Sequence, residues 1–223
     1  MIVTIHNVFQ AAELDKLAGL AAQAQFVDGK ATASGSAARV KNNQQAKGDD
    51  KALEEIRKLV LAGLLRSEPF NNFVLPLRIM PPLVNRYEPG MTYGDHIDRP
   101  VMQGPYAVRT DLAMTLFLAE PSSYDGGELV VSSDLGAQRI KLARGSLVLY
   151  PATTIHRVEP VTRGVRTAVV TWIQSMVREH EKRMMLAELA AVRRVVNAGK
   201  PDSAESLQLQ KIRANLLRMW ADV

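Results

Sequence analysis

The chain of 223 residues contains no cysteine. Disulfide bonds and thiolate metal sites are therefore excluded, and histidine and carboxylate side chains remain as metal ligands. Only four histidines are present, so each of them can be considered individually. The absence of cysteine also fits a reducing compartment, and we expect a cytoplasmic protein.

Aromatic residues are scarce and long apolar runs are missing. Aromatic side chains make up 5% of the chain, and none alternates with basic residues as in a base-stacking surface. The net charge of +5 therefore indicates either a solvated basic surface or a site that attracts an anionic substrate. Nucleic-acid binding is disfavoured. No stretch is apolar enough to cross a bilayer, and residues 1–7 predict no signal peptide.

The composition that is present, 47% hydrophobic and 23% charged, is ordinary for a globular protein. Three parts are predicted from changes in the pattern along the chain. Residues 1–74 form an N-terminal helical and loop support region, residues 75–176 a catalytic core, and residues 177–223 a C-terminal helical extension. We expect one domain with an appendage.

The N-terminal part predicts a short strand followed by a helix with Leu14, Leu17 and Ala21 on one stripe. Residues 26–50 are rich in small and polar residues and predict a long loop or an irregular edge, a type of segment that is often functional. A second amphipathic helix is expected over residues 51–66, where the apolar side chains recur at helical spacing.

The central part consists of short apolar runs separated by turn residues, which is typical of a β-sandwich or jelly roll. Strands are predicted at residues 77–80, 83–87, 112–118, 128–131, 137–142, 146–150 and 166–173. With the flanking helices, this pattern predicts an α+β fold that is mainly β.

The C-terminal part returns to helical spacing. The first helix is expected to bury a stripe of Met185, Leu189, Val192 and Val196, and it ends near Gly199. A second helix, expected to be capped by Asp202, carries an apolar stripe made of Leu209, Ile212, Leu216 and Trp220. We expect a helical hairpin that packs on the core or on another subunit, so a homo-oligomer is a possible assembly.

His96 and Asp98 lie two residues apart, so they point to the same side if this segment is extended. Alone, the pair could equally be a capped turn before Pro100. His156 follows an apolar strand and a proline turn and supplies a second imidazole. Two imidazoles and one carboxylate leave metal positions open, as ferrous iron requires when it binds a cosubstrate and dioxygen.

Arg166 follows His156 after a short chain reversal, and on a hairpin both side chains could face the interior. A buried arginine in an apolar strand needs an anionic partner, and its guanidinium matches a carboxylate in bidentate fashion. A dicarboxylate cosubstrate would supply that partner. The alternative is an ordinary arginine at a strand end. Trp172 is interpreted either as a wall of the site or as a core aromatic residue.

Several motifs together resemble the bacterial PKHD-type hydroxylases, which are Fe(II)- and 2-oxoglutarate-dependent dioxygenases related to prolyl 4-hydroxylases. The resemblance is carried by residues 85–91 (NRYEPGM), 93–98 (YGDHID), 144–151 (RGSLVLYP), 155–158 (IHRV) and 164–166 (GVR). It extends to residues 40–43 (VKNN) and to the helical tail, and so covers most of the chain.

This resemblance implies a double-stranded β-helix in which His96, Asp98 and His156 bind Fe(II) and Arg166 binds the distal carboxylate of 2-oxoglutarate. Tyr87 is a further expected cosubstrate contact. Phe117 replaces a tyrosine that some relatives present to the cosubstrate, so Arg166 would use another partner such as Thr115 or a water. L-ascorbate is a further candidate cofactor.

The implied activity is hydroxylation of a peptide, an amino-acid side chain or a siderophore-like molecule with O2, releasing succinate and CO2. Three alternatives stay open: a non-oxidative cupin-like metalloprotein, which would not need Arg166; a nucleic-acid demethylase; and a metal-sensing or assembly module. Residues 26–50 and 99–106 are the expected lids over the site.

Overall fold

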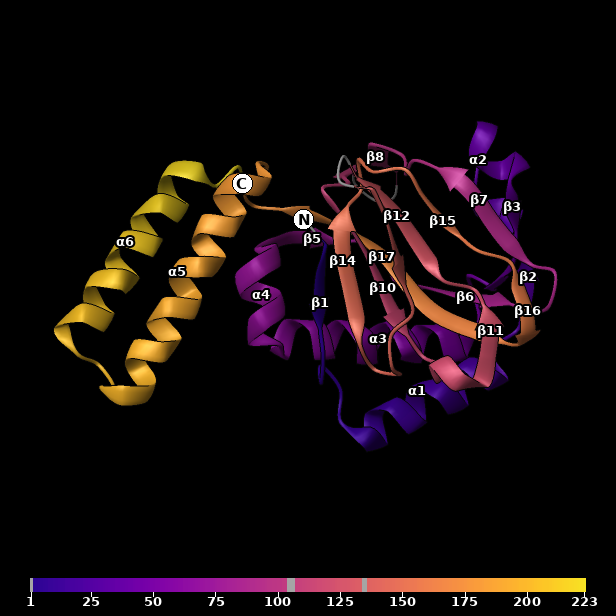
Figure 1. The fold of residues 1–223 in the computed structure, drawn as a ribbon, viewed down its shortest axis with the longest axis horizontal. Helices are drawn as coiled ribbons and strands as arrows, with labels where there is room; N and C mark the ends of the chain where they lie inside the picture. Colours follow the sequence, from indigo (N-terminus) through magenta and orange to yellow (C-terminus); the bar gives the residue numbers. More distant parts are fainter. Residues whose placement is uncertain (1, 104–106, 134–135) are drawn as a thin grey trace.

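The computed structural model describes residues 2–103, 107–133 and 136–223, and it consists of two antiparallel β-sheets with helices packed outside them (Figure 1). The larger sheet has the order β1 (Val3–Ile5), β14 (Leu147–Pro151), β10 (Leu112–Phe117), β17 (Arg166–Ser175), β6 (Leu83–Tyr87), β4 (Gln44–Ala46) and β2 (Phe26–Asp28), with β5 (Pro76–Ile79) paired to β17. The smaller sheet has the order β13 (Gly136–Ile140), β12 (Leu129–Ser133), β15 (His156–Val158), β7 (Thr92–His96) and β3 (Lys41–Asn42). The predicted α+β jelly-roll core is confirmed.

Two small two-stranded sheets complete the described strands: β11 (Tyr124–Gly126) with β16 (Val161–Gly164), and β8 (Val101–Met102) with β9 (Val108–Arg109). The helices are α1 (Ala11–Gln23), α2 (Gly35–Arg39), α3 (Lys51–Arg66), α4 (Glu68–Val74), α5 (His180–Gly199) and α6 (Ala204–Trp220), with 3₁₀ turns η1 (Gly29–Thr32) and η2 (Pro121–Ser123). Along the described chain, none of these helices has the length and apolar character needed to span a membrane.

The helix predicted over residues 51–66 is present with these bounds as α3. Asp50 caps it by accepting hydrogen bonds from the backbone N–H groups of Ala52 and Leu53. The apolar side chains spaced along one face are fully buried: Leu53, Ile56, Val60 and Leu64. They belong to a core between the helices and the larger sheet, and Figure 1 shows α1 and α3 side by side below that sheet. This layer supports the sheet from outside.

A second core fills the space between the two sheets. Ala113, Phe117 and Val148 come from the larger sheet and meet Leu129 and Val131 of the smaller one. The strands β10 and β14 of the larger sheet alternate their side chains between the two cores, as β10 does with Met114 and Leu116 on the helix side. Any side chain directed inward from a strand near this second core therefore points into the space between the sheets.

Residues 26–50 are more regular than predicted. They form β2, η1, α2, β3 and β4, and these strands extend the edges of both sheets. The pattern missed them because each strand has only two or three residues and depends on tertiary pairing: β3 pairs with β7, β4 with β6, and β2 with β4. The prediction of an irregular edge was correct in position, but the segment is not one long loop.

The C-terminal helical hairpin is present, but its predicted details need correction. Ser203, whose hydroxyl accepts a hydrogen bond from Ser206 N, caps α6 in place of Asp202, which has a positive φ of 55°. Met185 and Val192 are exposed, while Arg183 and Leu186 are the residues that α5 buries. Leu186 packs with a separate cluster that contains Leu75, Val177, Leu216, Leu217 and Trp220. The expected self-association through this hairpin stays a prediction.

Gly164 lies at the close approach of β16 to the 3₁₀ turn η2. Its φ is +71°, and a Cβ there would lie 2.1 Å from the backbone oxygen of Ser123. Gly164→Ala is expected to destabilise the protein by about 2–4 kcal/mol, since both left-handed strain and a backbone clash contribute. Urea unfolding of the variant measures this loss.

Gly90 provides the matched control because its φ is +86° and a Cβ would meet nothing within 4 Å. Gly90→Ala should cost only the strain, about 1–2 kcal/mol. Equal losses in the two variants would show that the contact with Ser123 does not restrict residue 164.

Candidate functional site

His96, Asp98 and His156 meet in the space between the sheets. His96 is the last residue of β7, His156 is the first of β15, and the two are directly opposite in the antiparallel pairing. One ligand atom from each of His96, Asp98 and His156 lies within 4.8 Å of the others. Ile97 is 55% exposed, so the alternation along this segment turns His96 and Asp98 inward together, as predicted. The structure thus assembles a three-ligand group that could hold a metal ion.

The backbone fixes which nitrogen of each histidine is available. Nδ1 of His96 lies 2.8 Å from the carbonyl oxygen of Gly94, and Nδ1 of His156 lies 3.1 Å from that of Thr154. A carbonyl oxygen can only accept, so both Nδ1 atoms carry the proton and donate it. The Nε2 lone pairs are then free, which is the tautomer required of a metal ligand.

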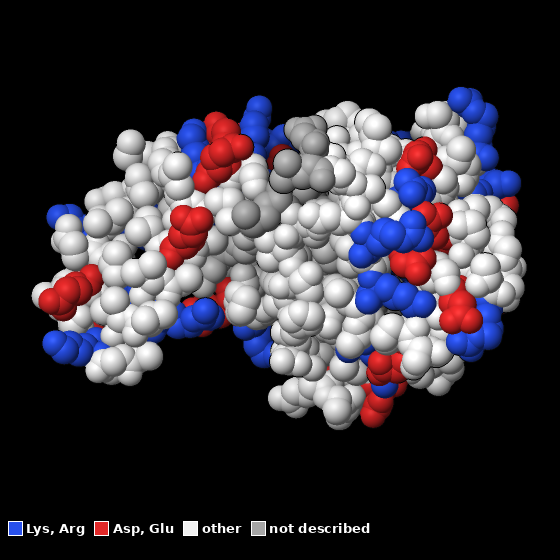
Figure 2. Space-filling view, viewed as in Figure 1, with Lys and Arg blue, Asp and Glu red and all other residues white. Residues whose placement is uncertain are grey.

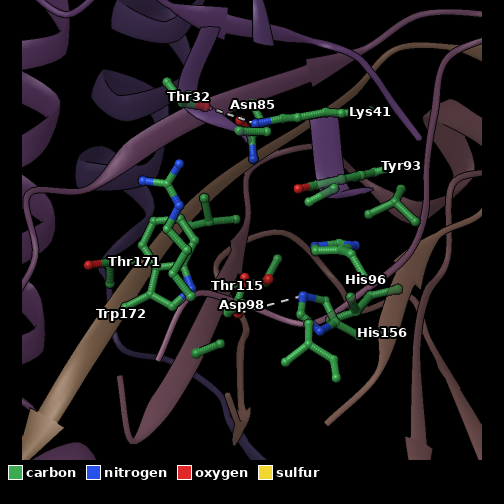
Figure 3. A pocket seen from close by; sticks show the side chains of 18 of the residues that line it. Thr32, Lys41, Asn85, Tyr93, His96, Asp98, Thr115, His156, Thr171 and Trp172 are labelled. Atoms are coloured by element: carbon green, nitrogen blue, oxygen red, sulfur yellow. Dashed lines mark hydrogen bonds and ion pairs between the residues drawn. The ribbon is translucent and has the colours of Figure 1, made fainter. Parts of the chain in front are cut away.

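Burial sets the charges of this group. It lowers the pKa of His96 to about 4, and the neighbouring His156 adds to the effect, so His96 is neutral near pH 7. Burial also raises the pKa of Asp98, opposed by His156 and by a hydrogen bond from the Trp172 side chain. Oδ2 of Asp98 is buried without a hydrogen-bond partner and lies 3.7 Å from Nε2 of His156 (Figure 3). An unpaired carboxylate oxygen beside two imidazole lone pairs fits a divalent cation.

Aromatic rings hold the two imidazoles in place. The Tyr93 ring stacks on His96 with centroids 3.6 Å apart, and Tyr150 meets His156 edge-on at 5.1 Å. Figure 3 shows Tyr93 between His96 and Lys41, and Trp172 across the pocket from them. Trp172 is therefore a wall of the site as well as a contact of Asp98, and it is not simply a core residue.

Arg166 reaches the same space from the opposite sheet, so the predicted hairpin between it and His156 was wrong. His156 is in β15 of the smaller sheet, whereas Arg166 begins β17, whose partners are β10, β6 and β5. The intervening residues form β16, which pairs with β11. The two side chains converge because the sheets face each other, a relation that spacing along the chain does not encode.

The Arg166 side chain is only 2% exposed, and no carboxylate of the described residues lies within ion-pair distance of it. Its Nε atom lacks a hydrogen-bond partner. The guanidinium instead lies over the Tyr87 ring at 5.2 Å and the Phe117 ring at 5.5 Å from the centroids. Burying a cation without a counter-ion costs free energy because the charge loses its hydration. This arrangement therefore fits an anionic ligand whose carboxylate pairs with the guanidinium.

The neighbours of Arg166 differ in part from those expected. Tyr87 lies opposite it in the sheet register, as a shared site requires. Thr115, the other partner considered for Arg166, forms a hydrogen bond with Tyr150. Tyr124, which the sequence did not indicate, is fully buried beside Arg166, and the nearby guanidinium opposes the rise that burial causes in its pKa. Tyr124 lies in β11, a strand of only three residues, so no periodicity marked it.

A cavity of about 990 Å³, including its open mouth, contains all five predicted site residues. The expected lid at residues 26–50 does contribute to it, through residues of η1 and α2, Lys41 and Gln45. From the second expected lid, Arg99 and Met102 line the cavity, and residues 104–106 lie outside the described residues. Lys41 is a lining residue that sequence reasoning did not select; its buried position in a two-residue strand left no pattern to recognise.

Burial lowers the pKa of Lys41 to about 8, although Asp28 and Asp98 oppose the shift. An unfolded lysine stays protonated up to about pH 10.4. Between these pH values the unfolded chain binds the extra proton, so the stability of the metal-free protein rises with pH in this window. The gain is at most about 3 kcal/mol.

Lys41→Met should remove this component, which unfolding in urea at pH 7.5 and pH 10 would measure as the difference between the two proteins. We expect the variant to be the more stable one at pH 7.5. Parallel pH dependences for wild type and variant would contradict the burial of a titrating amine at this position.

Basic side chains on the face shown in Figure 2 adjoin acidic ones. Arg157 pairs with Glu159 at 3.0 Å and with Asp95 at 3.3 Å, while Arg139 reaches Glu159 at 2.9 Å and Glu128 at 3.4 Å. Such a network neutralises itself and offers no continuous basic stripe to a phosphate backbone. These arginines are therefore neutralised locally by the neighbouring carboxylates.

Comparison with known proteins agrees with the geometry. Residues 82–174 match the model of the 2OG-Fe(II) oxygenase superfamily. A PKHD-type hydroxylase of Xanthomonas axonopodis pv. citri is 44% identical, with all of both chains covered. A solved Pseudomonas putida prolyl-4-hydroxylase has a TM-score of 0.53 and 19% identity, and covers 78% of this chain and 92% of its own. A Trichoplax adhaerens prolyl hydroxylase has a TM-score of 0.56 and 19% identity over 83% and 86%.

Proposed function

The chain belongs to the PKHD-type hydroxylases, within the Fe(II)- and 2-oxoglutarate-dependent oxygenases, and we propose that His96, Asp98 and His156 hold the iron while Arg166 binds the distal carboxylate of 2-oxoglutarate. The observation that carries this assignment is the buried Arg166 guanidinium, which lacks a carboxylate partner among the described residues and faces the same cavity as the triad. A metal-binding barrel that uses no anionic cosubstrate has no need of it.

When bound, iron and 2-oxoglutarate would supply the oxidising chemistry, in which a substrate C–H group, O2 and 2-oxoglutarate yield the hydroxylated substrate, succinate and CO2. The protein contributes by orienting the metal ligands and the cosubstrate and by excluding water from the site. The backbone carbonyls of Gly94 and Thr154 hold both imidazoles in the ligating tautomer, and Trp172 orients Asp98 through its hydrogen bond. These contacts fix the orientation of the three side chains that would hold the metal.

Arg166 fixes the other end of the cosubstrate. Its guanidinium can form two parallel hydrogen bonds with a carboxylate, and its low exposure keeps water from competing for them. Tyr87 lies beside it in the register, and we propose that its hydroxyl contributes to the same carboxylate. Phe117 supplies no hydroxyl, and Tyr124 is a further phenol that interacts with Arg166.

We place the catalytic core at residues 75–176, with support from residues 1–74 and an extension at residues 177–223. The proposed substrate is a peptide, an amino-acid side chain or a siderophore-like molecule, and L-ascorbate is the proposed reductant that keeps the bound iron ferrous. A peptide is the ligand of the solved Trichoplax adhaerens enzyme, which shares this fold.

The test is a succinate assay on the Fe(II)-loaded full chain. We expect 2-oxoglutarate-dependent succinate release that requires iron and O2, at a low basal rate without substrate and a higher rate when a screened compound is hydroxylated. If iron-loaded protein binds no 2-oxoglutarate and forms no succinate with any compound, the assignment of the site is wrong.

A further inference from the structure

Lys41 is a buried cation in the cavity that neither the metal nor the cosubstrate explains. Its side chain, in β3, is 4% exposed, and Nζ donates a 2.9 Å hydrogen bond to Oγ1 of Thr32. Nζ also lies 5.2 Å from the centroid of the Tyr93 ring. An ammonium group has three N–H donors, so capacity remains for a ligand. Within the described residues, no carboxylate lies at ion-pair distance from Lys41.

Lys41 is separated from the residues assigned to iron and 2-oxoglutarate. Figure 3 shows the Tyr93 ring between the amine and His96, so Lys41 lies on the far side of that ring from the triad. Arg166 belongs to the opposite sheet and is surrounded by Tyr87 and Phe117. Neither the triad nor the ring contacts of Arg166 involve the amine, so Lys41 is left to meet a further ligand in the same cavity.

The lysine is held in a defined position. Thr32, which accepts its hydrogen bond, also interacts through the same hydroxyl with the side-chain oxygen of Gln45. Both Thr32 and Gln45 line the cavity. This Lys41–Thr32–Gln45 chain joins η1 to β3 and β4, so the orientation of the amine does not depend on a mobile surface side chain.

The charges around the cavity do not balance. Its formally charged lining side chains are three cations, Lys41, Arg99 and Arg166, and one anion, Asp98. Fe(II) and 2-oxoglutarate carry equal and opposite charges, so loading the site leaves the positive excess unchanged. Arg99 is exposed at the cavity and bonds to Ser34 Oγ, and it too has no carboxylate at ion-pair distance in the described part of the chain. Two cations therefore face the remaining space without a counter-ion.

We infer that the substrate carries an anionic oxygen group, a carboxylate or a phosphate-like group, which Lys41 binds and Arg99 attracts to the cavity. This inference rests on the proposed function and narrows its substrate class. The anion would complete the donors of Lys41 and offset the cost of the buried charge. A neutral analogue of the same shape would leave the buried ammonium without a counter-ion and should therefore bind less tightly.

The test uses benzoate, phenyl phosphate and the neutral isostere benzamide as probes of the full chain loaded with Zn(II) and 2-oxoglutarate. With these present, the proposed carboxylate site at Arg166 is filled. Dissociation constants are measured by ligand-observed NMR. At least one anionic probe should bind about ten- to a hundredfold more tightly than benzamide, the range that a charge-assisted hydrogen bond supplies. Whether benzoate or phenyl phosphate binds more tightly distinguishes a carboxylate from a phosphate-like group.

Lys41→Met should reduce this preference to less than about twofold, and Lys41→Arg should keep part of it. Lys41→Gln removes the charge but retains a donor for Thr32, which provides a second neutral variant if Met disturbs the fold. Lys47→Met is the matched control, because Lys47 lies in the same segment with its side chain half exposed and paired with Asp49. We expect Lys47→Met to behave as wild type.

Loading is measured first and separates the two hypotheses. Wild-type protein that takes up no Zn(II) or 2-oxoglutarate would contradict the proposed function itself. If it loads normally, equal binding of anions and benzamide, or a preference that survives Lys41→Met and Lys41→Gln, would overturn the inference about Lys41. Loss of 2-oxoglutarate binding in both neutral variants would do so too, because the lysine would then belong to the cosubstrate site.

Discussion

His96→Ala and Asp98→Ala should each lower 2-oxoglutarate turnover by at least about a hundredfold, because a change in the outer shell of a metal site alone costs up to that much. Both side chains belong to the group of three ligands that the structure brings within 4.8 Å. Removing either leaves two ligands, which cannot hold the metal in a fixed geometry. The measurement is succinate formation at saturating iron, with bound metal counted in the same samples.

Asp95→Ala is the matched control for these variants. Asp95 lies in β7 next to His96, but its side chain points outward and pairs with Arg157 at 3.3 Å. An exposed ion pair contributes little, so the control should keep wild-type turnover and stability within about 1 kcal/mol. Iron-dependent turnover retained by both His96→Ala and Asp98→Ala would contradict the assignment of the triad.

Arg166→Met should raise the KM for 2-oxoglutarate by about a hundredfold or more, because breaking a buried charge pair costs about 3–5 kcal/mol. The same substitution should not destabilise the cosubstrate-free protein, since methionine removes a buried charge that has no carboxylate partner among the described residues. The two opposite effects, measured by succinate kinetics and by thermal unfolding, distinguish a ligand-binding arginine from a structural one.

The control for Arg166→Met is Arg163→Met in the preceding strand. Arg163 is exposed and pairs with Asp125, so its loss should leave the KM for 2-oxoglutarate unchanged. If Arg166→Met had an unaltered KM but unfolded at a much lower temperature, Arg166 would be a structural residue. The cupin-like interpretation of the barrel would then regain support.

Residues close in sequence were the ones that could be predicted. His96 ends β7 and Asp98 follows it by two residues, and the α3 stripe repeats at helical spacing, so a local period indicated both. Arg166 and His156 were each identified, but the prediction that they lie on one hairpin was wrong. They belong to different sheets and meet only because those sheets face each other. Lys41 and Tyr124 were missed since they lie in strands of two and three residues that only tertiary pairing creates.

The C-terminal hairpin illustrates a second limit. A helical stripe that includes Met185 and Val192 was a reasonable prediction from spacing, yet both residues are exposed and Leu186 is buried. Apolar side chains occur on several faces of α5, so spacing could not decide which face meets α4 and α6. The buried face of α5 is instead set by how the helix packs against its neighbours in the folded protein.

The most direct test of the central claim is the binding of 2-oxoglutarate with and without a metal, measured by calorimetry under anaerobic conditions. The proposed site predicts one 2-oxoglutarate per Zn(II)-loaded chain, and at least about a hundredfold weaker binding when either the metal or the Arg166 guanidinium is removed. Equal affinity in metal-free protein, or in metal-loaded Arg166→Met, would show that the triad and Arg166 do not form one site.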